Sequence, residues 1–223
     1  MILIMNKVAL SRIGWIIKTM DKESKPLNPP VNRIEKITKN DPFRSLVFTI
    51  LSARTRDEST IISAGNLLKA APNPKKLASL NIKKIENLVQ RSGFYRMKAK
   101  NLKMAAKMLE EKHDGKVPQT MEELIELPGV GRKTANILLA YSFGIKAIAV
   151  DTHVHRISNR LGIVKTKAPE KTERSLIRII PKRYWIALNH SFVSYGQTIC
   201  IPRNPKCSIC KIRKLCCRVG VKR

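Results

Sequence analysis

Apolar residues recur at three- and four-residue spacing along most of this chain, which is the pattern of helices that bury one face. The spacing predicts helices over Asn32–Lys39, Pro42–Ser52, Glu58–Ala70, Leu77–Leu80, Ile82–Arg91 and Met97–His113. Asp41, Asp57 and Asn81 stand at expected N-cap positions, where a side-chain oxygen accepts from a helix N–H. Gly93 and Gly115 stand where helices should end.

The segments between these helices add little other structure. The first 18 residues combine apolar and basic positions, and we read them as a first helix because no small-residue cleavage site follows. Three prolines predict an extended connector over Lys25–Pro30. Only Ala147–Val150 resembles a strand, and a strand without partners forms no sheet. We therefore expect an all-α protein of about ten short helices, and no apolar run approaches the roughly 20 residues of a membrane span.

The charge of the chain indicates its partner. The 223 residues include 44 Lys and Arg against 16 Asp and Glu, a formal net charge of +28. From Val150 to the C-terminus there are 17 basic and 3 acidic residues. Such an excess predicts a polyanionic partner, most often nucleic acid, with salt-sensitive phosphate contacts. The alternative is a merely basic surface with some affinity for membrane surfaces.

A glycine-rich turn joins two further predicted helices, Met121–Leu127 and Lys133–Tyr141. It reads Leu-Pro-Gly-Val-Gly-Arg-Lys-Thr-Ala over residues 127–135. The proline ends the first helix, and the two glycines permit a tight turn with positive φ. Backbone N–H groups at the start of the second helix could then bind a DNA phosphate. The alternative is an ordinary helical hairpin whose glycines permit close packing.

All five cysteines lie between Cys200 and Cys217, which indicates a metal or cluster site in a reducing compartment more than a disulfide framework. Four of them follow the spacing C-x6-C-x2-C-x5-C: Cys200, Cys207, Cys210 and Cys216. Thiolates suit iron–sulfur clusters or zinc. A zinc site with four cysteine ligands remains the alternative, although such sites more often comprise two close pairs. Cys217, beside Cys216, leaves the register of the fourth ligand open.

These motifs together resemble one family. The segment 127–135 resembles the helix–hairpin–helix signature of the DNA glycosylase superfamily, and the segment 150–154, Val-Asp-Thr-His-Val, resembles the aspartate motif that follows it. Leu51-Ser52-Ala53 and Gly93-Phe94-Tyr95 are similar to segments of endonuclease III. The cysteine spacing matches the [4Fe–4S] loop of the same relatives. The resemblance extends from about Ile34 to Arg218.

The resemblance implies an architecture. It predicts a six-helix barrel domain over residues 35–145, with the hairpin at 127–133, and a discontinuous cluster domain formed by residues 1–34 and 146–223, with the cluster loop at 200–216. Double-stranded DNA carrying a damaged base or an abasic site would lie in the groove between them. A monomer is expected, without membrane association, in the cytoplasm of a prokaryotic cell and associated with the nucleoid.

The resemblance also implies a mechanism. Lys133 falls on the catalytic lysine of the family and Asp151 on its catalytic aspartate. The amine of Lys133 would attack C1′ of the damaged nucleotide, form a Schiff base and permit β-elimination that breaks the strand 3′ to the lesion. A carboxylate would stabilise the positive charge that develops on the sugar. Without the resemblance, the two residues would be a solvated lysine and a helix N-cap.

The expected substrates are oxidised pyrimidines such as thymine glycol, with two alternatives. One is a mismatch (G·T or G·U) or uracil glycosylase on the same scaffold, and the other is a non-catalytic DNA-binding iron–sulfur protein. Arg54 occupies the position where the family has a glutamine that fills the gap left by the extruded base, so Arg54 is expected to contact the gap or the opposite base. The expected DNA contacts in the hairpin are Leu127, Gly129, Val130, Gly131, Arg132 and Thr134.

Overall fold

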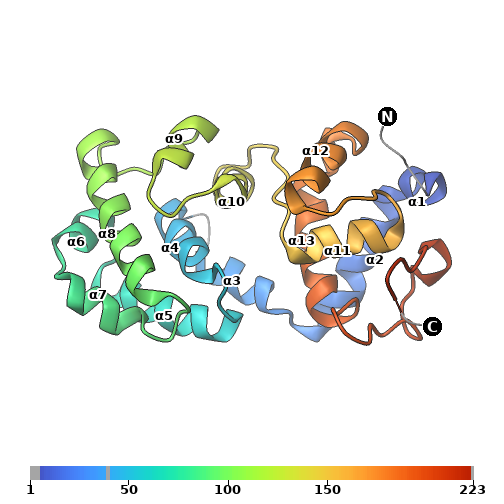
Figure 1. Ribbon diagram of the computed structural model, residues 1–223, viewed down its shortest axis with the longest axis horizontal. Helices are drawn as coiled ribbons and strands as arrows, with labels where there is room; N and C mark the ends of the chain where they lie inside the picture. The colour runs from blue at the N-terminus through green and yellow to red at the C-terminus, as the bar shows by residue number, and fades with distance from the viewer. Residues whose placement is uncertain (1–5, 39–40, 222–223) are drawn as a thin grey trace. The chain divides into compact units, whose positions relative to one another are not determined.

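The computed structural model describes residues 6–38 and 41–221 of the chain. Within these ranges every regular element is a helix and no strand is found, which confirms the predicted all-α class (Figure 1). The chain divides into two compact units. One comprises the residues up to Arg33 together with those from Lys146 onward, and the other comprises Ile34–Ile145.

The unit Ile34–Ile145 is built around a central helix. The helices are α3 (Pro30–Thr38), which begins just before this unit, α4 (Pro42–Ser52), α5 (Asp57–Ala70), α6 (Pro74–Ser79), α7 (Ile82–Val89), α8 (Tyr95–Lys112), α9 (Met121–Glu126) and α10 (Arg132–Ser142). α4 lies in the interior of the unit and buries Phe43 and residues 45–51, including the polar Ser45 and Thr49. It packs against α5, α8 and α10.

The helix boundaries in this unit follow the predicted caps in most places. Asp41 and Asn81 cap α4 and α7 through their side chains, as predicted. The prediction of Asp57 as an N-cap is wrong, because Arg56 holds the cap position and Asp57 is the first helical residue of α5. An acidic side chain there still interacts favourably with the helix dipole. The predicted end of α3 at Lys39 lies outside the described residues.

The other unit packs α2 along α13. Its elements are α1 (Lys7–Ser11), α2 (Ile13–Ser24), η1 (Lys25–Leu27), α11 (Thr152–Leu161), α12 (Pro169–Ile179), η2 (Lys182–Tyr184), α13 (Trp185–Thr198) and η3 (Arg213–Leu215). Figure 1 shows α2 and α13 side by side. Their shared core includes Ile16, Met20, Phe192 and Tyr195.

Two local predictions in this unit are wrong. From Asn6 onward the N-terminal segment forms two helices instead of one, because the chain leaves helical geometry at Arg12, between α1 and α2; residues 1–5 of the predicted helix lie outside the described residues. Lys25–Leu27 is a turn of 3-10 helix and not extended chain. The proline at its second position is compatible with this, since Pro is tolerated in the first turn of a helix, where its missing N–H would be unpaired anyway.

The strand-like segment Ala147–Val150 is buried and has no strand beside it in the described part of the chain. A side chain makes hydrogen bonds of the kind that a neighbouring strand would make. The amide of Asn189, on α13, accepts from the Ala149 N–H at 2.9 Å and donates to the Ala149 carbonyl at 2.7 Å. The Asn189 side chain thus supplies hydrogen-bond partners for both the N–H and the carbonyl of Ala149, two residues before Asp151.

We expect Asn189→Ala to lower the free energy of unfolding by about 2–4 kcal/mol, because it leaves a buried N–H and a buried carbonyl without partners. The matched control is Ser194→Ala on the same helix. The Ser194 hydroxyl is buried and has no hydrogen-bond partner among the described residues, so its removal should cost little. Urea unfolding monitored by circular dichroism measures both. Equal stability of the two variants would contradict the role assigned to Asn189.

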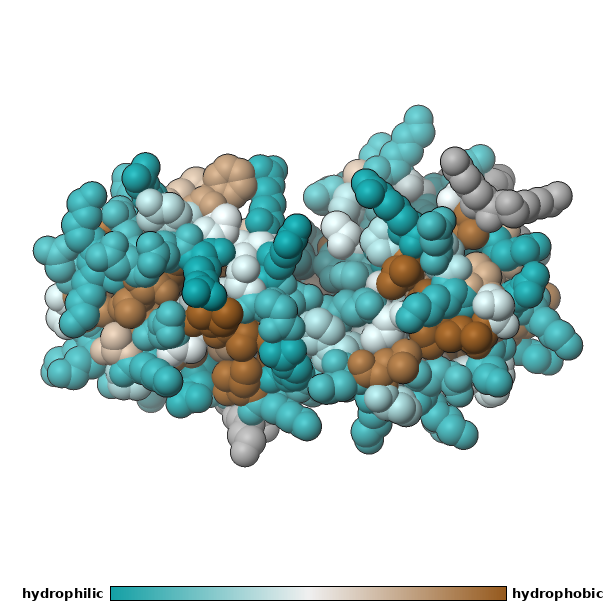
Figure 2. Space-filling view, turned by 90° about the horizontal axis from the view of Figure 1, so that it is seen from below, coloured by the Kyte–Doolittle hydropathy of each residue, from teal (hydrophilic) through white to brown (hydrophobic). Residues whose placement is uncertain are grey.

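One face of the molecule is predominantly polar. The face seen in Figure 2 is covered mostly by hydrophilic side chains, with only small apolar patches between them. In the part of the chain that the structure describes, no helix combines the length and hydrophobicity needed to cross a membrane.

Candidate functional site

The turn between α9 and α10 has the geometry that its sequence predicts at one of its two glycines. The Val130 N–H donates to the Leu127 carbonyl at 2.9 Å, which closes a four-residue turn. Gly129 has a φ of +86°, and Pro128 precedes it, as in a type II turn. A Cβ at Gly129 would lie 3.1 Å from the Cβ of Asn101 on α8. Glycine is therefore favoured there by its positive φ, and a side chain would also crowd Asn101.

The prediction of positive φ at Gly131 is wrong. Its φ is −99° and its ψ is 177°, which is extended backbone at the N-cap of α10. A Cβ at this position would meet no atom within 4 Å. The turn itself thus does not require this glycine, and its missing side chain leaves the start of α10 open to a close approach from outside.

The other hairpin residues divide into buried and exposed ones. The side chains of Leu127 and Val130 are buried, so these two residues can meet a ligand only through their backbone. Arg132 and Lys133 are exposed in the first turn of α10, and Thr134 is half-buried. The helix start thus presents two basic side chains beside backbone N–H groups.

Asp151, in the other unit, is the N-cap of α11. Its Oδ1 accepts from the Val154 N–H at 2.8 Å, and the residue is half-buried. The carboxylate is therefore held by the helix that follows it and by the Asn189-bound segment that precedes it. Both predicted catalytic residues lie at the beginning of a helix, one in each unit.

Arg54 lies in the turn that follows α4 and has a φ of +51°, in the left-handed region that non-glycine residues rarely occupy. Its guanidinium carbon lies 5.7 Å from the centre of the Phe94 ring, within the range of a cation–π interaction. Both residues are exposed. The predicted contact residue is thus presented at the surface beside an aromatic ring.

Lys98 on α8 is a buried cation to which the sequence pattern assigned no role. Its side chain is 4% exposed, and its ammonium donates to oxygens of the turn that carries Arg54. Burial lowers the pKa of Lys98 to about 8, so the group is still protonated at neutral pH. A signal was present, since Lys98 stands one helical turn before the buried Leu102, on the face of α8 that packs inward.

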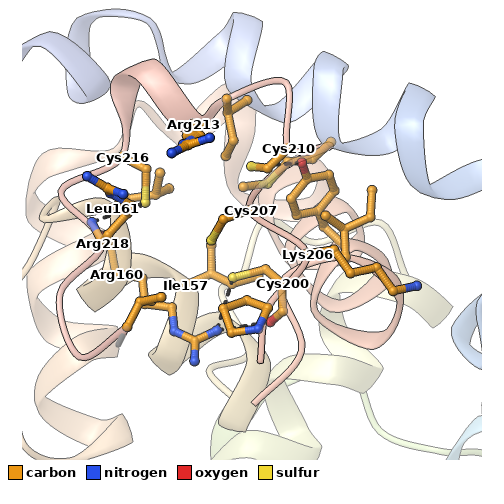
Figure 3. A pocket seen from close by; sticks show the side chains of 16 residues that line it. Ile157, Arg160, Leu161, Cys200, Lys206, Cys207, Cys210, Arg213, Cys216 and Arg218 are labelled. Atoms are coloured by element: carbon orange, nitrogen blue, oxygen red, sulfur yellow. Dashed lines mark hydrogen bonds between the residues drawn. The ribbon is translucent and has the colours of Figure 1, made fainter. Parts of the chain in front are cut away.

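The four predicted cysteine ligands line one pocket in the unit that contains α13. Figure 3 shows their side chains around this pocket, with Arg160 beside them. Tyr195 also lines the pocket. In residues 6–38 and 41–221, no group of three or more His, Cys, Asp or Glu side chains converges closely enough to hold a single metal ion. Cys217 is exposed and does not line the pocket.

Hydrogen bonds reach three of the four sulfur atoms. The Arg160 guanidinium donates to Cys200 Sγ at 3.3 Å, and the Tyr195 hydroxyl donates to Cys210 Sγ at 3.2 Å. The backbone N–H of Arg218 lies 3.4 Å from Cys216 Sγ. Burial raises the pKa of the Cys210 thiol, and it raises that of Cys216 to about 11. A ligand that binds thiolates at neutral pH must therefore displace protons from these cysteines.

Two arginines of α11 hold the start of the cysteine loop. Arg156 donates to the Cys200 carbonyl at 3.0 Å. Arg160 donates to the carbonyls of Ile201 at 2.8 Å and Pro202 at 2.7 Å. The loop is thus fixed to the helix that Asp151 caps.

The hairpin with its basic helix start, the capped aspartate and the cysteine pocket define a helix–hairpin–helix DNA repair protein. Comparison with known proteins agrees: residues 47–182 match the HhH-GPD superfamily of base excision DNA repair proteins, and the chain belongs to this family. This range contains the hairpin and Asp151 but ends before the cysteine loop.

The relatives place the chain more closely. It is 48% identical over 176 residues to Endonuclease III of Thermotoga maritima, a match that covers 79% of this chain and 83% of that protein. Among solved structures, a non-covalent endonuclease III–DNA complex superposes with a TM-score of 0.79 at 31% identity, covering 93% of this chain and 94% of the other. A trapped endonuclease III–DNA covalent intermediate gives 0.75 at 32% identity, covering 86% and 95%. These matches confirm the predicted endonuclease III family and the class of base excision repair enzyme.

Proposed function

We propose that this protein is a bifunctional DNA glycosylase and abasic-site lyase that removes oxidised pyrimidines of the thymine glycol type. The observation that carries the proposal is the exposed Lys133 in the first turn of α10, directly after the type II turn and within the matched segment. The names of the relatives, endonuclease III and a trapped covalent complex of endonuclease III with DNA, support covalent chemistry on DNA.

The proposed roles follow from the two side chains. The amine of Lys133 attacks C1′ of the sugar as the bond to the damaged base breaks. The amine loses a proton and the C1′–O4′ bond breaks, which opens the sugar ring, and the resulting protonated Schiff base makes the C2′ proton removable. Loss of that proton expels the 3′ phosphate by β-elimination. Asp151, held as a cap with its carboxylate partly accessible, stabilises the positive charge that builds on the sugar.

DNA binding is proposed for three features of the two units. The hairpin residues named above and the N–H groups of α10 would bind phosphate, with Leu127 and Val130 contributing backbone only. Arg54 would enter the gap left by the extruded base or contact the opposite base. The unit Ile34–Ile145 would be the barrel domain and the other unit the cluster domain, with DNA bound by both.

We expect Arg132→Ala to weaken binding to unrelated DNA sequences by about the same factor and to reduce the slope of log K against log salt by about 1. The reason is that an exposed arginine at a helix start neutralises a phosphate and does not contact base edges. Fluorescence anisotropy with two duplexes over a salt series measures both quantities. A loss confined to one sequence would contradict the phosphate role.

A [4Fe–4S] cluster is the cofactor that best fits the cysteine pocket. The donor set is four thiols, with N–H and O–H donors directed at three of their sulfurs. Such donors stabilise cluster thiolates. The four cysteines line one pocket, where each thiolate could bind one iron of such a cluster. When bound, the cluster would hold the loop and its basic residues in one conformation.

We expect Cys207→Ala to remove the absorbance near roughly 400 nm that an iron–sulfur protein shows, and to lower the thermal midpoint. Cys217→Ala is the matched control, because Cys217 is exposed and lies outside the pocket. It should keep both colour and stability. Visible spectra and iron content of the purified variants decide the matter. Zinc in place of iron would support the alternative site with four cysteine ligands.

Substrate assays test the function as a whole. Duplexes carrying thymine glycol, uracil, a G·T mismatch or an abasic site separate the possibilities. Base release coupled to strand cleavage on thymine glycol is the expected result. Release of uracil or mismatched thymine without cleavage would favour the monofunctional alternative, and no reaction on any of them would favour a non-catalytic DNA-binding protein. We further propose that the protein acts as a monomer and that it is cytoplasmic. The second proposal agrees with the cysteine site, which needs reduced thiols.

A further inference from the structure

The buried ammonium of Lys98 holds the turn that carries Arg54. Lys98 Nζ lies 2.6 Å from the carbonyl oxygen of Leu51 and 2.6 Å from that of Ala53. It also lies 2.7 Å from Thr55 Oγ1 and 2.9 Å from Ser92 Oγ. All four oxygens are uncharged, and the three N–H groups of the ammonium are shared among them. A buried ammonium is stable without a carboxylate only when such acceptors solvate it, so Lys98 and the turn depend on each other.

A second contact brings the turn against the start of α8. The Gly93 N–H donates to Thr55 Oγ1 at 3.0 Å. A Cβ at Gly93 would lie only 2.7 Å from the carbonyl oxygen of Arg54, which is too close for any other residue unless the backbone moves. Phe94 follows directly, with a φ of +56° and 59% of its surface exposed. Because Gly93 has no side chain, the Arg54 backbone can lie close to it. The Arg54 guanidinium then lies over the ring of the next residue, Phe94.

These contacts explain how Arg54 keeps a left-handed backbone. A non-glycine residue in this region carries a conformational cost that surrounding contacts must offset. The carbonyls immediately before and three residues before Arg54 are both bound to Lys98, and the next residue, Thr55, is bound to Lys98 and to Gly93. Backbone and guanidinium of Arg54 are thus restrained separately, the first by Lys98 and the second by Phe94.

We propose that Lys98 is a positioning residue, whose buried ammonium holds the Leu51–Thr55 turn so that Arg54 is presented to the base opposite the lesion. This inference rests on the proposed function of Arg54 as a DNA contact. Lys98 itself touches no DNA, because its side chain is enclosed by the turn and by α8. Asn101, one helical turn further along α8, packs against Gly129 of the hairpin. α8 therefore contacts both the Arg54 turn and the hairpin.

The test compares Lys98→Met, Arg54→Ala and the double variant. Single-turnover rates of base release are measured with the lesion opposite guanine and opposite adenine, and the ratio of the two rates is the readout. We expect each single variant to change this ratio about tenfold in the same direction, the size expected for loss of one good contact to a base. The double variant should change it no further, because Lys98 acts through Arg54.

Lys100→Met is the matched control. It removes the same charge from the same helix, but Lys100 is exposed and lies on the face of α8 that points away from the buried Lys98 side chain. It should leave the ratio unchanged. A second variant guards against poor folding of Lys98→Met: Gly93→Ala displaces the Arg54 carbonyl without removing any hydrogen-bond donor, and it should change the ratio in the same direction.

Hydrogen exchange of the free protein supplies a readout that needs no enzymatic activity. The amides of Thr55 and Gly93 should exchange faster in Lys98→Met than in wild type and Lys100→Met. Unchanged exchange would overturn the proposal, as would a ratio that Arg54→Ala alters and Lys98→Met does not, or effects that multiply in the double variant. No effect of Arg54→Ala would remove the role on which the inference rests. Failure of the proposed function is detected separately: the wild-type protein would then give no borohydride-trapped Schiff-base adduct with DNA that contains an abasic site.

Discussion

Replacing Lys133 by alanine should abolish the covalent adduct that borohydride traps between this protein and DNA containing an abasic site or thymine glycol. The Lys133 amine is the proposed nucleophile, so its removal should leave no imine to reduce, and strand cleavage should fall by about 10³-fold or more. The structure makes the substitution mild in other respects. Lys133 is exposed in the first turn of α10, where alanine is a good helix former.

Two further variants give this result its meaning. Lys133→Arg keeps the positive charge and the helix but cannot form a Schiff base, because guanidinium stays protonated. It should bind DNA nearly as well as wild type and give no adduct. Arg132→Ala should bind more weakly and still form the adduct at saturating protein. Adduct formation by Lys133→Ala would assign the nucleophile to another amine. An adduct from wild type on the abasic site alone would keep the lyase and change the substrate base.

Replacing Asp151 by asparagine should reduce base release by about 10²–10³-fold, the size found when one electrostatic group of an active site is removed. It should leave the fold nearly unchanged. The Asp151 side chain caps α11 through a hydrogen bond to the Val154 N–H, and asparagine caps a helix about as well as aspartate. The substitution therefore removes the charge and retains the cap.

Asp151→Ala separates the two roles further. It removes charge and cap together and should lose about 0.5–2 kcal/mol of stability in addition to activity. Thermal unfolding and single-turnover base release are measured on the same preparations. Full activity of Asp151→Asn would show that the residue is only a cap, which is the ordinary role of an aspartate before a helix. Loss of base release in Asp151→Asn with an unchanged thermal midpoint would assign the carboxylate to the chemistry.

Features that depend on neighbours along the chain follow from the sequence alone. Helix periodicity and the caps at Asp41 and Asn81 are decided within four residues, and the structure confirms both. The turn at Gly129 follows from its Pro-Gly pair for the same reason. The errors at helix ends are also local. The choice between Arg56 and Asp57 as the N-cap of α5 is a shift of one residue, and weak competing preferences decide it.

The motifs that carry the candidate site are also visible in the sequence. Their spacing, together with the resemblance to endonuclease III, is enough to indicate Lys133, Asp151 and the cysteines. The structure adds the physical setting of each. It shows Lys133 exposed, Asp151 as a cap, Cys216 in the pocket and Cys217 outside it. Gly131 shows the limit of motif reading, because the same residue type serves two different backbone conformations in one turn.

Contacts that join distant parts of the chain, in contrast, are known only from the folded molecule. Asn189 pairs with Ala149 across 40 residues, and Lys98 reaches Leu51 across 47. No local preference predicts either, since a buried asparagine or lysine is costly until the fold brings its partners to it. These two side chains hold backbone next to residues of the proposed site, one before Asp151 and one beneath Arg54. Sequence pattern thus indicates candidate residues for the proposed reaction, and only the packed structure shows which side chains hold them in place.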